Sequence, residues 1–282
     1  LDGLSWPTAD GSSNQVLKTD GSGTLSWSSA ATSINGLSDA LVEDNSTYLG
    51  NDPSSTTDDA LRNVAVGLIA LDAITTGDNN VAVGYNALTA NTTGSHNIGI
   101  GYNALKANVG GTSNAAIGYG SLASNTSGQF NTGVGSSSLN ANINGQRNVG
   151  IGNSSLRDNS SGNYNTAVGK SSGQSITTGD DNVTIGHQAG ILLTTGNYNT
   201  ILGSDSDPSA EDAINQAMVG YGVTGQADNS VVLGNSDVTA VYMAQDKGAT
   251  VHAAGADLSG SRGLILENDE TITNSTDGTV LI

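Results

Sequence analysis

The chain has 282 residues and a formal net charge of −18, and aromatic residues make up only 4% of it. So few aromatic side chains argue against an ordinary globular core. Phosphate binding needs clustered basic residues, and the eight Lys and Arg residues are scattered, so we expect no nucleic-acid partner. The absence of cysteine excludes a disulfide framework and thiolate metal sites.

The first 30 residues are predicted to form a β-hairpin that serves as an attachment or linking segment. Asp20-Gly21 is a turn signal, and it stands between Val16-Leu17 and Thr24-Leu25. Residues 31–62 contain few apolar side chains and several turn-forming ones, so we interpret them as a connector.

A glycine then returns every 17 residues without a slip, and an asparagine stands four residues before it. The glycines are Gly67, Gly84, Gly101, Gly118, Gly135, Gly152, Gly169, Gly186, Gly203 and Gly220. The asparagines are Asn63, Asn80, Asn97, Asn114, Asn131, Asn148, Asn165, Asn182 and Asn199, with Gln216 in the tenth place. A fixed period of this length indicates a stacked-repeat architecture.

Seventeen residues fit two short strands and two turns, so each repeat is predicted to be one rung of an all-β, parallel β-solenoid of about ten rungs over residues 63–234. Stacked rungs place identical residues ~4.8 Å apart. The asparagine column is therefore predicted to form an amide ladder. We assign these asparagines and glycines a structural role in the repeat rather than a role in binding.

Other columns of the repeat predict its packing. The residue before each glycine, such as Val83 or Ile117, is aliphatic and is predicted to be a core track. The residue before that, such as Ala116, is usually small and must face the other way; we expect a neighbouring chain to approach there. A leucine column is predicted on the far side of the coil: Leu71, Leu88, Leu105, Leu122, Leu139 and Leu156. A second glycine column, from Gly77 to Gly196, suggests turns with positive φ.

The stack changes towards its end. Residues 204–214 leave the consensus but keep the period, so we expect an irregular loop there, and the shorter step from Gly220 to Gly234 indicates that the stack is ending. Residues 235–282 are predicted to be a thin β tail that leads to a further domain or tip. Because the chain starts at Leu1 and stops within an apolar run, we expect it to be part of a longer protein.

A search for chemistry gives little. His96, His187 and His252 lack the spacing of metal ligands, and the carboxylates at 205, 207, 211 and 212 have no aromatic sugar cleft nearby. We therefore expect no catalytic residue, no cofactor and no enzyme activity, while isolated calcium ions stay open. The tyrosines Tyr85, Tyr102 and Tyr119 are interpreted as rings stacked rung on rung, with a ligand platform as the alternative.

The rungs N-V-A-V-G at 80–84 and N-T-A-V-G at 165–169, and A-D-N-S-V-V-L-G-N at 227–235, resemble the repeats of YadA-like trimeric autotransporter adhesin heads, which form a left-handed parallel β-roll. The same repeat occurs in phage tail-fibre and appendage proteins. The stretch from residue 6 to residue 27 is similar to segments of marine phage fibre proteins. The resemblance implies a homotrimer, and a fibre that presents or spaces a receptor-binding tip.

Three functional classes stay open. The first is a virion fibre or appendage shaft, with other virion or tail proteins and a host glycan or protein receptor as partners, and no membrane insertion. The second is a bacterial surface adhesin or extracellular filament. The third is an enzyme or ice-binding solenoid, for which the paired threonines such as Thr75-Thr76 are the signal; Val109-Gly110 and Ile143-Asn144 interrupt that array.

Overall fold

The computed structural model describes residues 5–13, 15–29, 40–43, 45–50, 59–239 and 241, and their secondary structure consists of strands and turns. The predicted hairpin is present. β1 (Gln15–Thr19) pairs antiparallel with β2 (Leu25–Ser29), with Leu17 opposite Trp27.

The turn of the hairpin is closed by Asp20. Its carboxylate accepts hydrogen bonds from the backbone N–H groups of Ser22 (2.8 Å) and Thr24 (3.0 Å). Gly21 follows with φ +79°, a conformation that glycine adopts without steric cost. The indole N–H of Trp27 donates to the carbonyl of Ala9 at 2.7 Å, so the segment before β1 is held against β2.

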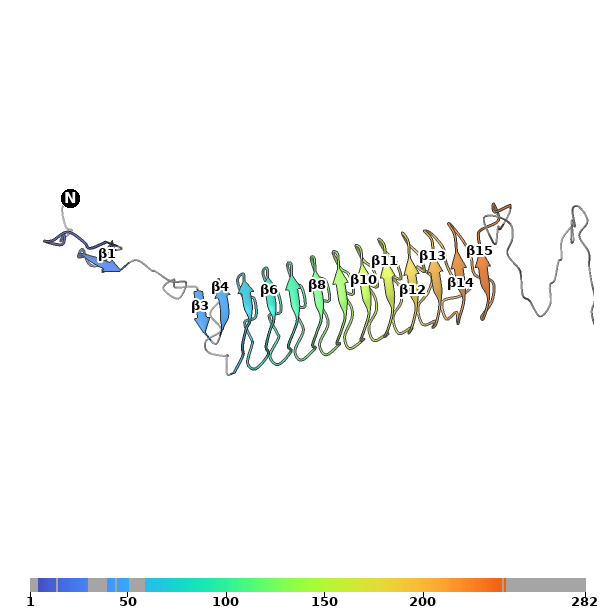
Figure 1. Cartoon of the computed structure of the whole chain (residues 1–282), viewed down its shortest axis with the longest axis horizontal. Coiled ribbons are helices and arrows are strands. Elements are labelled where there is room, and N and C mark those ends of the chain that lie inside the picture. Colours follow the sequence, from blue (N-terminus) through green and yellow to red (C-terminus); the bar gives the residue numbers. More distant parts are fainter. Residues whose placement is uncertain are drawn as a thin grey trace, which may run out of the picture. The chain divides into compact units, whose positions relative to one another are not determined.

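A 13-stranded sheet holds the remaining strands in the order of the sequence, and Figure 1 shows β5 to β15 side by side in one row. It begins with β3 (Ala40–Glu43) and β4 (Ser46–Leu49), which form an antiparallel pair inside the predicted connector. All later neighbours, from β4 onward, are parallel. The eleven three-residue strands of the repeat region are β5 Val64–Val66, β6 Val81–Val83, β7 Ile98–Ile100, β8 Ala115–Ile117, β9 Thr132–Val134, β10 Val149–Ile151, β11 Thr166–Val168, β12 Val183–Ile185, β13 Thr200–Leu202, β14 Ala217–Val219 and β15 Val231–Leu233.

The strand register confirms the predicted parallel solenoid. Each residue pairs with the residue 17 positions later, as Ile100 does with Ile117 and Ile117 with Val134. The last step is shorter, because Ala217 of β14 pairs with Val231 of β15. Residues 204–214 contain no regular strand, as expected, although Asp207 and Ile214 still form single bridges to neighbouring rungs.

Each rung has one strand rather than the predicted two. On the far side the backbone turns, with Leu88 at φ +52° and Leu105 at φ +51°. Left-handed φ interrupts a strand and costs a residue with a Cβ roughly 1 kcal/mol or more. The rungs nevertheless stay bonded there, since the N–H of Leu88 donates to the carbonyl of Ala104 at 3.0 Å.

The predicted core track is wrong, and so is the predicted role of the small residues. Ile117 and its equivalents lie on the outer face of the sheet, whereas Ala116 and its equivalents are fully buried inside the coil with the leucine column. The interior of the coil is narrow, because each rung consists of one strand and its turns. Large side chains on both the strand wall and the leucine wall would therefore collide. A Cβ placed on Gly99, for example, would lie 3.2 Å from Cγ of Leu88.

The reason for glycine at the turns also differs from the predicted one, which was a positive φ. Gly77 and Gly111 are not among the residues with positive φ. A Cβ at Gly111 would instead overlap the side chain of Asn108 and lie 2.5 Å from the carbonyl oxygen of Gly128. Close approach of successive rungs is therefore what requires glycine at this column. The predicted β tail, apart from residues 235–239 and 241, lies outside the described residues.

Candidate assembly surface and interior ladders

The predicted amide ladder runs through the interior of the solenoid. Asn63, Asn80 and the later members are fully or almost fully buried. The side-chain oxygen of Asn63 accepts the backbone N–H of Asn80 at 2.8 Å, and the Asn80 amide group donates to the carbonyl of Gly94 at 2.9 Å. One asparagine therefore joins its strand to the next rung and to the turn. An aliphatic side chain of the same size would leave these buried backbone groups without partners.

The strand-end glycines lie where each strand turns away from the sheet. From Gly67 to Gly220 their φ values are between +128° and +147°. A Cβ at Gly118 would also lie 2.7 Å from the carbonyl carbon of Gly135 in the next rung. Both the backbone conformation and the stacking distance thus select glycine at this position.

A second ladder, which the sequence analysis did not identify, consists of Asn91, Asn108, Asn125, Asn142 and Asn159. From Asn108 onward, each amide nitrogen donates to the side-chain oxygen one rung before it, at 2.7 to 2.9 Å. Ile74 and Ile176 occupy the column beyond its two ends. Isoleucine cannot donate a hydrogen bond, so Oδ1 of Asn159 is buried without a partner. The signal in the sequence is an asparagine three residues before the turn glycine in five successive rungs.

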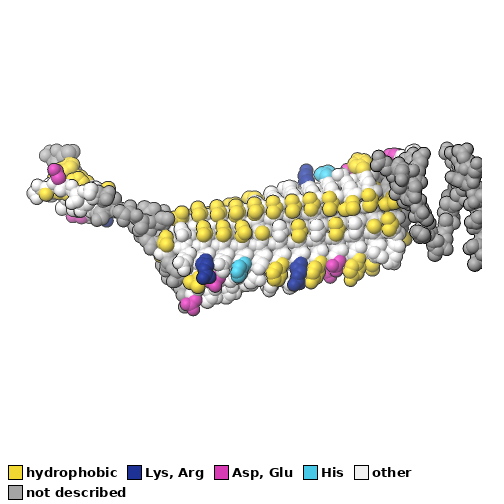
Figure 2. Space-filling view, in the orientation of Figure 1, with side chains coloured by type: hydrophobic (Ala, Val, Ile, Leu, Met, Phe, Trp, Pro, Cys, Tyr) yellow, Lys and Arg dark blue, Asp and Glu magenta, His cyan; other side chains and the backbone are white. Residues whose placement is uncertain are grey.

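The outer face of the sheet is apolar along the whole stack. The first and third residues of each strand point outward, and Figure 2 shows them as two parallel rows of mostly hydrophobic side chains. Ile98, Ile100 and Ile117 are 37 to 41% exposed. Threonines interrupt the first-residue row at three strands, whereas the third-residue row is aliphatic in all eleven. We call this surface the sheet face. With eleven strands ~4.8 Å apart, it is ~48 Å long.

The sheet face has two edges, which we define by their columns of side chains. The strand-end edge follows the strand-end glycines and contains Leu68, Tyr85, Tyr102, Tyr119, Ser136, Asn153, Lys170, His187, Ser204, Tyr221 and Asn235. On it, Tyr102 stacks on Tyr85 and on Tyr119, with ring centroids 5.5 and 5.3 Å apart. This is the predicted rung-on-rung stacking.

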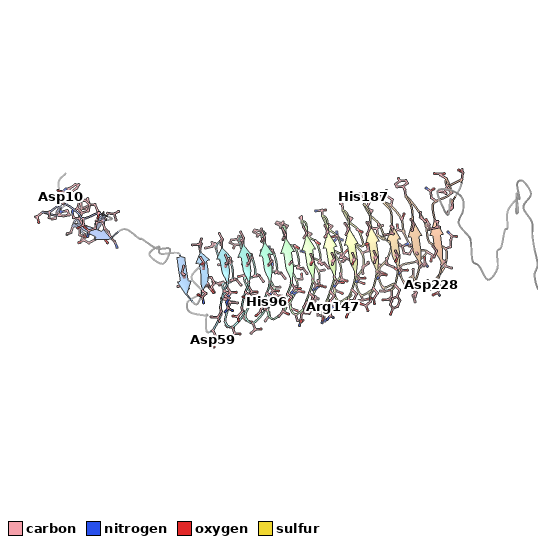
Figure 3. All side chains as sticks on the ribbon, in the orientation of Figure 1. Asp10, Asp59, His96, Arg147, His187 and Asp228 are labelled. Atoms are coloured by element: carbon pink, nitrogen blue, oxygen red, sulfur yellow. The ribbon has the colours of Figure 1, made fainter. Side chains whose placement is uncertain are left out.

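The strand-start edge precedes the buried asparagines and contains Arg62, Asn79, His96, Ser113, Phe130, Arg147, Tyr164, Asp181, Tyr198, Asn215 and Asn229. The guanidinium carbon of Arg147 lies 5.3 Å from the ring centre of Phe130 and 5.4 Å from that of Tyr164, and Nη1 of Arg147 donates to the Tyr164 hydroxyl at 2.9 Å. Figure 3 shows His96 and Arg147 at one edge of the strands and His187 at the other. Sequence reasoning missed this edge because its residues differ from rung to rung.

The histidines and carboxylates singled out in the sequence do not form a site. Nδ1 of His187 lies 3.4 Å from a carboxylate oxygen of Asp205, whereas His96 lies at the other edge and His252 is outside the described residues. Burial raises the pKa of the Asp207 carboxyl, although the N–H of Leu192 donates to it at 2.8 Å. Among the described residues, no group of three or more His, Cys, Asp or Glu side chains is placed to hold a metal ion.

A hollow of about 270 Å³ lies beside β15, at the end of the stack. It is lined by Gly222, Thr224, Gln226, Val232, Gly234, Asn235 and Ser236, and it contains no titratable side chain. Within the part of the chain that the structure describes, no helix has the length and apolar character needed to cross a membrane.

Comparison of the chain with protein-family models, with curated proteins and with solved structures found no match. The strand topology and the buried asparagines by themselves identify a parallel β-solenoid repeat protein with interior asparagine ladders. The resemblance to YadA-like heads and to phage fibres stays a prediction.

Proposed function

We propose that this chain is a structural subunit of a phage tail fibre or appendage. Three copies pack about a common axis and form a shaft that spaces or presents receptor-binding elements for host adsorption. The virion setting and the number three come from the sequence resemblance. The observation that carries the proposal is the exposed, aliphatic sheet face.

The sheet face needs a covering partner. Soluble monomers rarely expose long contiguous apolar surfaces, and surfaces of this kind usually mark protein–protein contacts. Each Å² of apolar surface that is covered contributes roughly 25 cal/mol, and the face repeats that gain in every rung. Cyclic symmetry turns the same face of each copy towards the axis, so every copy is covered by its neighbours.

The interior suits a structural role. Asparagine ladders, stacked glycines and a leucine column connect each rung to the next. In each threonine pair, the hydroxyl of the first threonine forms a hydrogen bond with the next rung. For example, Thr75 Oγ1 donates to the carbonyl of Thr92 at 3.0 Å. The continuous interior ladders support a spacer, and the engaged threonine hydroxyls count against an ice-binding surface.

Two measurements test the proposal. Light scattering of the purified chain should give about three times its mass of 28.1 kDa; a stable monomer would refute the trimeric shaft. Antibodies against residues 59–239 should label appendages on virus particles in electron micrographs. Labelling of a bacterial surface instead would support the adhesin alternative and contradict the virion assignment.

A further inference from the structure

The two edges of the sheet face carry complementary charges at the same height of the stack. Asp181 is the only acidic residue of the strand-start edge, and Lys170 and His187 are the only basic residues of the strand-end edge. Tyr164 and Lys170 lie just before and after β11, and Asp181 and His187 flank β12 in the same way. Asp181, Lys170 and His187 therefore lie in two neighbouring rungs.

The surroundings of Asp181 resemble a site that is already filled elsewhere on the same edge. Phe130 and Tyr164 are two rungs apart, and the guanidinium of Arg147 lies between their rings at 5.3 and 5.4 Å. Tyr164 and Tyr198 are also two rungs apart, and Asp181 lies in the rung between them. Tyr164 and Tyr198 are 51% and 60% exposed, and the residue between them is a short carboxylate rather than a long cation. Aromatic rings and a negative charge together attract an ammonium group.

Neither Asp181 nor Lys170 is engaged through its side chain within its own copy. Among the described residues, the Asp181 carboxylate and the Lys170 ammonium make no side-chain hydrogen bond or ion pair. Both side chains are exposed. They lie on opposite edges of the sheet face, and an ion pair between them therefore requires two copies of the chain.

We propose that Lys170 of one copy inserts beside Asp181 of the next copy, between the rings of Tyr164 and Tyr198. His187 is level with Asp181 and lies 3.4 Å from Asp205 of its own copy. This inference rests on the proposed trimer. In a cyclic assembly of parallel, in-register chains, the strand-end edge of one copy meets the strand-start edge of its neighbour. Lys170 is then level with Tyr164 and one rung, ~4.8 Å, from Asp181, a step that its four-carbon stem spans.

The contact adds a charge pair that the apolar face does not supply. Because the aliphatic columns repeat every 17 residues, a slip of one rung exchanges one set of Val and Ile contacts for another. The charged rungs do not repeat. A slip of one rung towards the N-terminus places Lys170 level with Arg147, where like charges repel, whereas a slip towards the C-terminus places it level with Asp181.

The test is a charge-reversal cycle on the full chain: Lys170→Glu, Asp181→Lys and the two together. Each single variant should raise the protein concentration at which half of the trimer dissociates by about tenfold or more, as expected for loss of a close interfacial charge pair. The double variant should restore dissociation to within a few-fold of the unmodified chain. Lys106→Glu changes the charge by the same amount away from the sheet face and should leave dissociation unchanged.

The outcomes separate the two proposals. A monomeric unmodified chain removes the proposed trimer and this contact with it. If the unmodified chain is a trimer and the single variants dissociate at the same concentration, the contact is wrong and the trimeric shaft stands. The same holds if the double variant dissociates as readily as the single variants. The contact is supported if both single variants weaken the trimer, the double variant restores it, and Lys106→Glu has no effect.

Discussion

Ala116 and Ile117 are neighbours on β8 and face opposite sides of the sheet: Ala116 is fully buried in the coil, whereas Ile117 is 41% exposed on the sheet face. The smaller residue is inside because the leucine column occupies the opposite wall of a narrow coil. The larger residue lies on the outside, where we propose that it contacts another copy of the chain. If the proposed assembly is correct, alternate residues of the same strand serve fold stability and assembly.

The first prediction concerns Ile117→Asp. Because the side chain lies on the outer face, the variant should keep the β-structure of the unmodified chain but behave as a monomer. Its stability as a monomer should change by less than about 1 kcal/mol, as is usual for surface substitutions. Circular dichroism and light scattering at matched concentration check the two parts.

Leu122→Asp is the matched control, since Leu122 is fully buried. An unpaired carboxylate there costs several kcal/mol and should unfold neighbouring rungs as well, because each rung is supported mainly by its neighbours. Equal loss of β-structure in both variants would contradict the outward placement of Ile117.

The second prediction separates the middle of the second ladder from its end. Asn125→Ala removes the donor to Oδ1 of Asn108 and the acceptor for the amide of Asn142. Buried groups left without partners cost about 1 to 3 kcal/mol. Asn159→Ala deletes the same atoms but also removes an oxygen that has no partner. In urea unfolding, Asn125→Ala should therefore be the more destabilised variant, and the reverse order would argue against the ladder.

The periodicity of the sequence predicted the parallel stack, the length of the rungs and the first asparagine ladder, because each depends on the same residue returning in each rung. It did not predict which strand face is interior. Alternation places Ala116 and Ile117 on opposite faces, but the width of the coil decides which face is enclosed. The strand-start edge was missed for the opposite reason: Phe130, Arg147 and Tyr164 form one surface without sharing a residue type.

The third prediction distinguishes two reasons for glycine. Gly111→Ala should destabilise the solenoid by about 1 to 3 kcal/mol, the usual cost of overpacking, because the added methyl group meets the Asn108 side chain and the Gly128 carbonyl. Gly222→Asn is the control: its φ is +59°, a value at which asparagine is tolerated, and the nearest atom to an added Cβ is 3.9 Å away. Thermal unfolding should show a clear loss only for Gly111→Ala; a larger loss for Gly222→Asn would reverse the assignment.

The last prediction is a pH dependence of the N-terminal hairpin. Hydrogen bonds from the backbone of Ser22 and Thr24 lower the pKa of Asp20 from 3.8 to about 2. The folded pKa lies below the unfolded value, so the contribution of Asp20 to hairpin stability is complete above about pH 4 and is lost as the pH falls through about 2. Trp27 reports on the hairpin through its bond to Ala9, and its fluorescence should change over this interval. Asp20→Asn keeps a side-chain acceptor but cannot titrate, so its fluorescence should be constant there; the same transition in both proteins would show that another group is responsible.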